Sequence, residues 1–119
     1  MEEILYDTNI LIDLLKQNTE NIKGYTTALN IVEYPKILKI KQLNIIYPTP
    51  RDYKTAITIS KNLYKKGKPV PAIDIITAAI AVNRKLTLLT KNIHFKYIKE
   101  VEEKLQLKLI KHSFSIKPS

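Results

Sequence analysis

The chain has 119 residues, 45% of them hydrophobic, which suits one globular domain with its own core and excludes a disordered segment. It has no cysteine, which excludes disulfides, thiolate zinc sites and cysteine nucleophiles. Twenty Lys and Arg residues face eleven Asp and Glu residues, so the formal net charge of +9 favours a polyanionic partner such as nucleic acid.

The basic residues are almost all lysines, since only Arg51 and Arg84 are arginines. Sites that read base edges or grip phosphate with two hydrogen bonds usually favour arginine. The charge therefore predicts a diffuse field that attracts phosphates and does not indicate a sequence-specific reader.

The predicted elements alternate between strands and helices. In chain order they are a strand at 3–6, a helix at 10–16, an edge strand at 24–27, a helix at 28–40 that Pro35 kinks or breaks, a strand at 44–47, a helix at 50–66, a helix from Pro71 to about Arg84, a strand at 86–89, a helix at 94–103 and a strand at 107–110. The tail beyond His112 is expected to fray. This alternation indicates one three-layer α/β/α domain over 1–119, with a central, mostly parallel sheet of four to five strands.

The N-terminal residues lack a basic segment and a small-residue cleavage site, so no signal peptide is expected. The longest apolar stretch, residues 75–82, is interrupted by Thr77 and falls far short of the roughly 20 residues that a membrane span needs. We therefore expect a soluble, cytoplasmic protein.

Three acidic residues lie in apolar stretches, where an unpaired carboxylate is costly. Asp7 ends the first strand, Glu33 lies between Leu29 and Ile37 on one helix stripe, and Asp74 falls in the first turn of a helix. Sites in parallel sheets lie beyond the carboxyl ends of the strands, so one strand end and two helices can bring these carboxylates together. Carboxylates without Cys or His neighbours suit Mg²⁺ or Mn²⁺.

Each acid taken alone also has an ordinary structural explanation. Asp7 could cap the following helix, Asp74 could interact with a helix dipole, and Glu33 could pair with Lys36. Asp13 is expected at the surface. The two histidines are too few and too far apart in sequence to indicate zinc.

Four segments resemble, in order, the motifs of PIN domains, the fold of VapC toxins. They are residues 6–13 (YDTNILID), 30–35 (NIVEYP), 71–81 (PAIDIITAAIA) and 88–95 (LLTKNIHF). Their order and spacing match this family over about residues 4–110. The resemblance implies a PIN-like fold and a Mg²⁺- or Mn²⁺-dependent endoribonuclease that is the toxin of a VapBC-type toxin-antitoxin system.

The resemblance also implies roles for individual residues. Asp7, Glu33 and Asp74 would be the catalytic metal ligands, and Thr8 would help to hold the metal or its water. Many relatives carry a fourth acid at or near the position of Asn92, so one firmly bound ion and a weaker second ion are expected. Asn92 could act as a ligand, or it could simply be a turn residue after a strand.

The implied partners are an RNA substrate, a VapB-like antitoxin and a second copy of the chain. Backbone contacts to RNA are expected from surface lysines, namely Lys65, Lys66, Lys68 and Lys91. Two alternatives stay open at this point: a non-catalytic PIN-like module that binds RNA or protein, and a housekeeping RNA-processing nuclease.

Overall fold

The computed structural model describes residues 2–115. Within them, five strands form one parallel sheet in the order β3-β2-β1-β4-β5. The strands are β1 (Ile4–Tyr6), β2 (Asn21–Thr27), β3 (Lys41–Ile46), β4 (Thr87–Thr90) and β5 (Gln106–Leu109). The expected α/β class with a parallel central sheet is confirmed.

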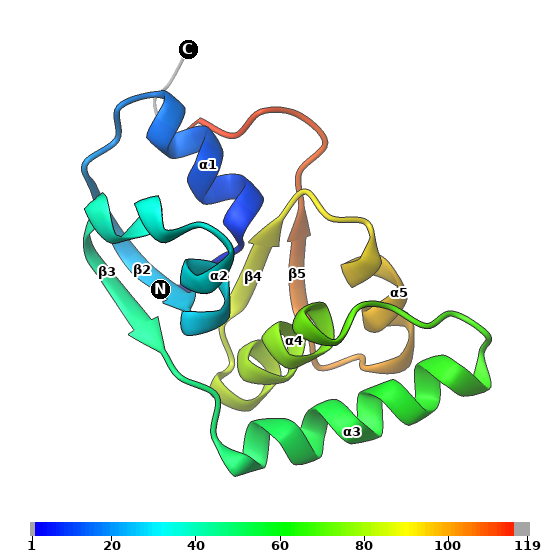
Figure 1. Ribbon diagram of the computed structural model, residues 1–119. Coiled ribbons are helices and arrows are strands. Elements are labelled where there is room, and N and C mark those ends of the chain that lie inside the picture. Colours follow the sequence, from blue (N-terminus) through cyan, green and yellow to red (C-terminus); the bar gives the residue numbers. More distant parts are fainter. Residues whose placement is uncertain (1, 116–119) are drawn as a thin grey trace.

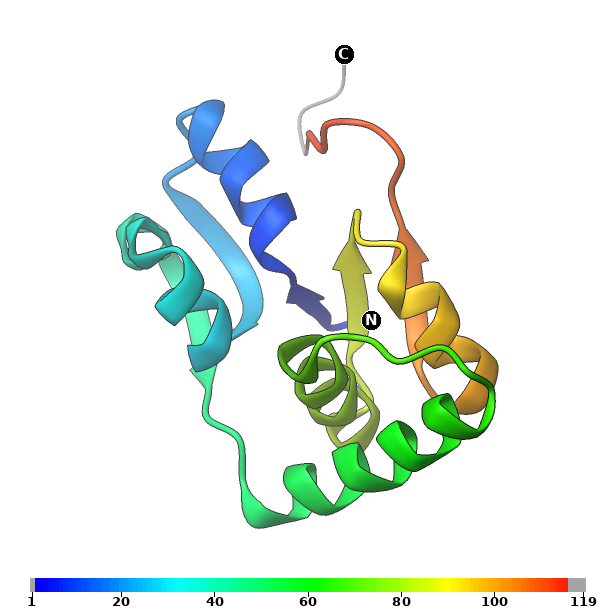
Figure 2. The ribbon, with the colours of Figure 1, turned by 45° about the vertical axis from the view of Figure 1, so that its right-hand side comes forward.

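Helices cover both faces of this sheet, as Figures 1 and 2 show. The helical segments are α1 (Thr8–Lys16), α2 (Ala28–Glu33), the 3-10 helix η1 (Pro35–Lys39), α3 (Pro50–Lys65), α4 (Ala72–Arg84) and α5 (His94–Val101). No helix in residues 2–115 is long and apolar enough to cross a membrane.

The core divides into two clusters because neighbouring residues of a strand point to opposite faces. Leu5 and Leu88 pack with apolar side chains of α3, α4 and α5. Tyr6 and Leu89, one position further along the same strands, pack with α1 and η1 instead. The two central strands are therefore buried from both sides, which explains their uninterrupted apolar sequences.

Several boundaries differ from the sequence prediction. Pro35 breaks the expected helix at 28–40, because α2 ends at Glu33 and η1 begins at Pro35. The segment at 24–27 is not an edge strand: β2 starts at Asn21 and lies between β1 and β3. The sequence did not indicate an internal strand here, because β2 contains many polar residues and is buried mainly at its carboxyl end.

In the tail that was predicted to fray beyond His112, the Phe114 backbone N–H donates to Asp13 Oδ2 at 2.8 Å. Its ring packs against the cluster beneath α1. The rest of that tail, 116–119, lies outside the described residues.

A buried carboxylate joins α3 to α4. Asp52 is 1% exposed, and its two oxygens accept hydrogen bonds from Arg84 Nη1 and Nη2 at 2.8 and 2.9 Å. Asn83 Nδ2 and the Thr49 N–H also donate to it, at 2.9 and 2.8 Å. Burial alone would raise the pKa of Asp52, but these hydrogen bonds and the Arg84 charge outweigh burial and lower the pKa to about 2.

This link predicts a specific loss of stability in acid. Because the pKa of Asp52 is lower in the folded chain than its ordinary 3.8, the ionised form stabilises the fold above that value. The contribution, about 2 kcal/mol, is lost as the pH falls through the folded pKa. Urea unfolding of the wild type and of Asp52→Asn should show a difference in unfolding free energy that is present at pH 6 and shrinks toward pH 2. A difference that stays constant with pH would contradict this assignment.

Candidate functional site

The candidate site lies at the carboxyl ends of the two central strands. Asp7 directly follows β1, and its backbone N–H extends the sheet by donating to Leu89 O at 3.0 Å. Thr90 is the last residue of β4. This edge is where sites form in parallel sheets.

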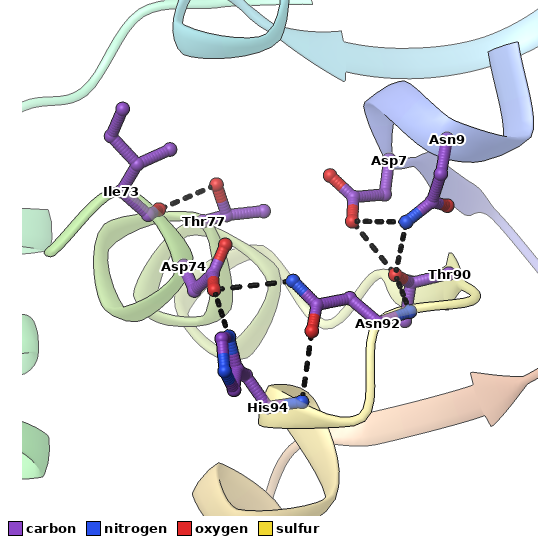
Figure 3. Close-up of polar contacts among 8 residues, drawn as sticks. All are labelled: Asp7, Asn9, Ile73, Asp74, Thr77, Thr90, Asn92 and His94. Carbon is purple, nitrogen blue, oxygen red and sulfur yellow. Dashed lines mark hydrogen bonds and ion pairs between the residues drawn. The ribbon is translucent and has the colours of Figure 1, made fainter. Parts of the chain in front are cut away.

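Asp7 caps α1, as one of its sequence explanations proposed. Its Oδ1 accepts from the Thr8 N–H at 2.9 Å. The cap uses only one oxygen, however. The other, Oδ2, accepts from Thr90 Oγ1 at 2.7 Å and lies 3.5 Å from Asn9 Nδ2. Capping therefore explains half of this carboxylate's environment, and the contact with Thr90 turns Oδ2 toward β4 (Figure 3).

The electrostatic environment of Asp7 is unfavourable for its charge. The side chain is 6% exposed, and burial raises its pKa, although the hydrogen bonds from Thr90 and Thr8 act in the opposite direction. The negative charges of Asp74 and Glu33 raise the pKa further. These effects identify Asp74 and Glu33 as its electrostatic neighbours, so the structure brings all three predicted carboxylates to one region.

Glu33 reaches this region from the end of α2. Its Oε1 lies 2.9 Å from Thr8 Oγ1, which is also 3.0 Å from Asn30 Oδ1. The single hydroxyl proton of Thr8 can serve only one of these acceptors at a time. Asn30 is fully buried and donates to Tyr6 O and Thr26 Oγ1, so it anchors this corner to the sheet.

The expectation that Glu33 projects from an apolar stripe is wrong, because its side chain is exposed. The helix ends at Glu33, so Ile37 belongs to η1 and is not its neighbour one turn along the same helix. The proposed pair with Lys36 is not formed among the described residues.

Asp74 lies in the first turn of α4, and its Oδ2 accepts two hydrogen bonds (Figure 3). Asn92 Nδ2 donates at 3.2 Å, and His94 Nδ1 lies 3.0 Å away. A carboxylate only accepts, so Nδ1 carries the proton whenever Asp74 is ionised. His94 is thus part of the site, although the sequence analysis treated both histidines as uninformative.

Asn92 has a structural role and a site contact together. Its Oδ1 accepts from the His94 N–H at 2.9 Å, and its own N–H donates to Thr90 Oγ1 at 3.0 Å. These bonds shape the turn between β4 and α5, as a turn residue would. Its amide nitrogen faces Asp74, so in this arrangement its oxygen is turned away from that carboxylate.

The three carboxylates face one another without forming a closed ligand set. Among residues 2–115, no group of three or more His, Cys, Asp or Glu side chains is compact enough to hold a metal ion. No lysine or arginine in this part of the chain forms an ion pair with Asp7, Glu33 or Asp74. Lysine and arginine therefore do not offset the charge of this region, and its basic contact is His94 Nδ1, 3.0 Å from Asp74 Oδ2.

The lysines expected to contact RNA are divided between two places. Lys65, Lys66 and Lys68 are exposed around the end of α3, and Lys68 Nζ lies 3.4 Å from Glu100 and 4.9 Å from the centre of the Tyr97 ring. Lys91 lies in the turn after β4. The structure does not gather these four side chains into one surface.

Lys91 pairs with Asp13 at 2.7 Å. Asp13 is only 7% exposed, so its expected surface position is wrong. Burial alone would raise the pKa of Asp13, but Lys91 and the Phe114 N–H lower it. The turn that carries Lys91 is also held by Asn9, whose Oδ1 accepts from the Lys91 N–H at 3.0 Å.

The sequence analysis missed four residues that position the site: Asn9, Asn30, Thr90 and His94. All four lie inside the motif-like segments, next to the acids. A usable signal was present for Thr90, since it is a polar residue at the carboxyl end of an apolar strand.

Replacing Asp7 should stabilise the metal-free protein. The pKa of Asp7 is raised by folding, so its ionised form opposes folding, and stability is lost as the pH rises through the folded pKa. Asp7→Asn keeps the shape and removes the charge. We expect its thermal midpoint in EDTA at pH 7.5 to exceed that of the wild type by a few degrees, since about 1 kcal/mol corresponds to roughly 4 °C. The gain should vanish at pH 3.5; a lower midpoint at pH 7.5 would contradict this account.

No protein-family model and no curated protein sequence matches the chain. Solved structures do. A chain of VapBC2 from Rickettsia felis, bound to a DNA fragment from the promoter, matches with a TM-score of 0.73 and 20% identity over 89% of this chain and 97% of that chain. DNA-bound VapBC from Salmonella typhimurium gives a TM-score of 0.73 and 20% identity over 91% and 98%.

VapBC-5 from Mycobacterium tuberculosis matches with a TM-score of 0.69 and 15% identity, over 92% of this chain and 98% of that chain. At such identities the likeness concerns the fold. It extends over nearly the full length of both chains. The chain therefore has the PIN-type fold of the VapC toxins in VapBC complexes.

Proposed function

We propose that the protein is a metal-dependent endoribonuclease that hydrolyses RNA phosphodiester bonds and acts as the toxin of a VapBC-type system. The observation that carries this proposal is the buried carboxylate of Asp7, which has Asp74 and Glu33 as electrostatic neighbours and no basic partner. A chain of net charge +9 that leaves these three acids unneutralised is suited to attract a cation there and an RNA backbone around it.

The donor set fits Mg²⁺ or Mn²⁺. The available groups are carboxylate oxygens of Asp7, Glu33 and Asp74, with the hydroxyl of Thr8 beside Glu33. Hard cations prefer such oxygen ligands, and no thiolate is present in the chain. Glu33 is exposed, so its side chain has room to move toward a bound cation, which would also offset the repulsion between the carboxylates. One firmly held ion and a weaker second ion remain our expectation, because Asn92 supplies no charge.

When bound, a divalent ion would activate water as a Lewis acid and offset charge on the phosphoryl group. Thr90 and the Thr8 N–H hold Asp7, while Asn92 and His94 hold Asp74. In the proposed mechanism, one of the carboxylates, such as the exposed Glu33, would take a proton from the attacking water. The water oxygen then bonds to phosphorus in line as the bond to the 3′ oxygen breaks, and that oxygen takes a proton from solvent. The family resemblance implies a 5′-phosphate product.

A non-catalytic RNA- or protein-binding module is the second candidate. It is favoured by the lack of a compact metal-ligand group within residues 2–115 and by the amide at Asn92. A housekeeping RNA-processing nuclease would use the same residues as a toxin. A short reading frame for a DNA-binding antitoxin beside the gene would favour the toxin.

A VapB-like antitoxin is the proposed inhibitor, since the matching solved structures are VapBC toxin-antitoxin complexes. The cytosol is the compartment that such a function requires, because RNA and the antitoxin meet there.

A second copy of the chain is proposed to pack on α3 and α4. This face exposes large apolar side chains: Tyr53, Ile57, Tyr64 and Ile73. A groove of about 200 Å³ runs between the two helices, lined by Ala56, Ile75 and Ile76 among others. Two copies related by a twofold axis would place identical apolar faces together.

The nuclease proposal predicts that Asp7→Asn and Asp74→Asn each lower the rate of RNA cleavage with Mn²⁺ by at least about 100-fold. Replacing a residue that hydrogen-bonds to a metal ligand typically lowers metal affinity or activity about 10–100-fold, and replacing a ligand itself should lower activity further. The assay follows a labelled single-stranded RNA, with EDTA as the metal-free reference. Glu103→Gln removes one charge from an exposed site and serves as the matched control.

Excess Mn²⁺ should also raise the thermal midpoint of the wild type and leave that of Asp7→Asn unchanged. Wild-type cleavage rates in both site variants, with their folds intact by circular dichroism, would refute the proposal. Absence of Mn²⁺ binding together with retained RNA binding would favour the non-catalytic module.

The proposed dimer predicts that Ile57→Lys yields monomers in light scattering at concentrations where the wild type is dimeric, because a charge would be buried in an apolar contact. Val32→Lys is the control, since Val32 is 80% exposed but lies on α2. A dimer that survives Ile57→Lys would place the interface elsewhere.

A further inference from the structure

A basic cleft of about 400 Å³ lies between the C-terminal end of α1 and η1. Its lining includes Lys16, Thr19, Glu20, Tyr34, Lys36 and Lys39. We propose that this cleft binds the phosphodiester backbone of single-stranded RNA and leads it to the carboxylates. The idea that RNA in the cleft is a substrate of the carboxylates rests on the proposed nuclease function. RNA binding to the cleft can be tested without catalysis.

The lysines of this cleft are free to contact a ligand. Lys16, Lys36 and Lys39 are exposed, and none of them forms an ion pair within residues 2–115. Lys16 acts at a distance on Asp13, but Lys91 already pairs with that carboxylate. By contrast, Lys68 and Lys91 are engaged by acids.

The cleft has an excess of positive charge despite one opposing acid. Glu20 is the carboxylate in its lining, against three lysines. The C-terminal carbonyls of α1 could also repel an anion, but several are already bonded. Leu14 O accepts from the Gln17 and Thr19 N–H groups, and Leu15 O accepts from the Asn18 N–H.

The cleft and the candidate site are linked in sequence at the junction of α2 and η1. Tyr34 lines it and directly follows Glu33, whose Oε1 contacts Thr8 at the other end of α1. Ile37 of η1 packs in the same cluster as Leu14 of α1, so the two helices lie side by side on one face of the sheet (Figures 1 and 2). The proposed route for the RNA backbone therefore runs between these two helices over the length of α1, from Lys16 in the cleft to Glu33 beside Thr8.

The other hollows have a different chemistry. One of about 640 Å³ near the amino ends of the strands is lined by Glu2, Glu3 and Lys23, so acids outnumber bases among its charged groups. The groove between α3 and α4 is almost entirely apolar. The cleft beside η1 is thus the hollow whose charge suits a phosphate chain.

The test compares two triple variants that lose the same charge. The cleft variant is Lys16→Gln, Lys36→Gln and Lys39→Gln. The control variant is Lys54→Gln, Lys61→Gln and Lys104→Gln, three exposed lysines outside the cleft that form no ion pair within residues 2–115. Fluorescence anisotropy measures binding of a labelled single-stranded RNA in EDTA, from roughly 50 to 200 mM KCl.

Each phosphate contact with single-stranded nucleic acid contributes about 0.7 to the slope of log affinity against log salt. The cleft variant should therefore lose about 2 from this slope, and the control variant should lose little. In the Mn²⁺ cleavage assay, the cleft variant should raise KM for RNA and leave kcat close to the wild-type value.

Equal slopes in the two triple variants would overturn the proposal and show a diffuse field instead. The proposal would also be overturned if the cleft variant lost binding to an acidic protein partner while the salt slope of its RNA affinity stayed at the wild-type value. If a triple variant unfolds, Lys36→Gln and Lys39→Gln are measured singly, each with an expected slope loss of about 0.7. If the wild type does not cut RNA but the cleft variant still shows the smaller salt slope, the cleft proposal is supported and the nuclease proposal is refuted.

Discussion

The pairing of β1 with β4 is the constraint on which the candidate site depends. Its register sets Tyr6 beside Leu89, so the residues that follow, Asp7 and Thr90, lie side by side at the carboxyl ends of the two strands. Thr90 can then donate to Asp7 at 2.7 Å. The turn after Thr90 carries Asn92 and His94 to Asp74, which α4 supplies from the other side of the site. A slip of one residue in this register would turn every side chain of β4 to the opposite face and dismantle these contacts.

The carboxylates are positioned by neutral donors. Thr8, Thr90 and Asn92 fix the direction of their oxygens without cancelling their charge. Asp52 and Asp13, which serve the fold, are instead paired with Arg84 and Lys91. The chain thus pairs its structural acids with Arg or Lys, whereas the candidate-site acids have neutral donors and, at Asp74, a histidine. Such an arrangement costs stability, a pattern common at functional sites, where geometry is kept for a ligand that restores the balance.

The sequence predicted the features that depend on local pattern. Apolar runs located the strands, Pro35 marked the break after α2, and the carboxyl-end rule placed Asp7 and Asp74 in one region. What it missed depends on long-range contact. The burial of Asp13 comes from Lys91 and from the return of the chain at Phe114, 101 residues away. Glu33 is exposed because α2 ends at this residue. Ile37 therefore lies in η1 and not one turn further along the same helix.

Composition alone does not show which lysines are already paired with acids in the fold. A net charge of +9 suggests one broad field, but the contacts divide the lysines into engaged and free groups. Lys68 and Lys91 face acids, whereas Lys16, Lys36 and Lys39 face an open cleft. An acidic site repels an RNA backbone. Binding of RNA at such a site therefore needs nearby basic side chains that are not already paired with acids of the fold. In our proposal, the lysines beside η1 meet that need. They line a cleft together with Tyr34, the residue after Glu33, and none of them pairs with Glu33, so they can draw the backbone in and leave the carboxylates available for a metal ion.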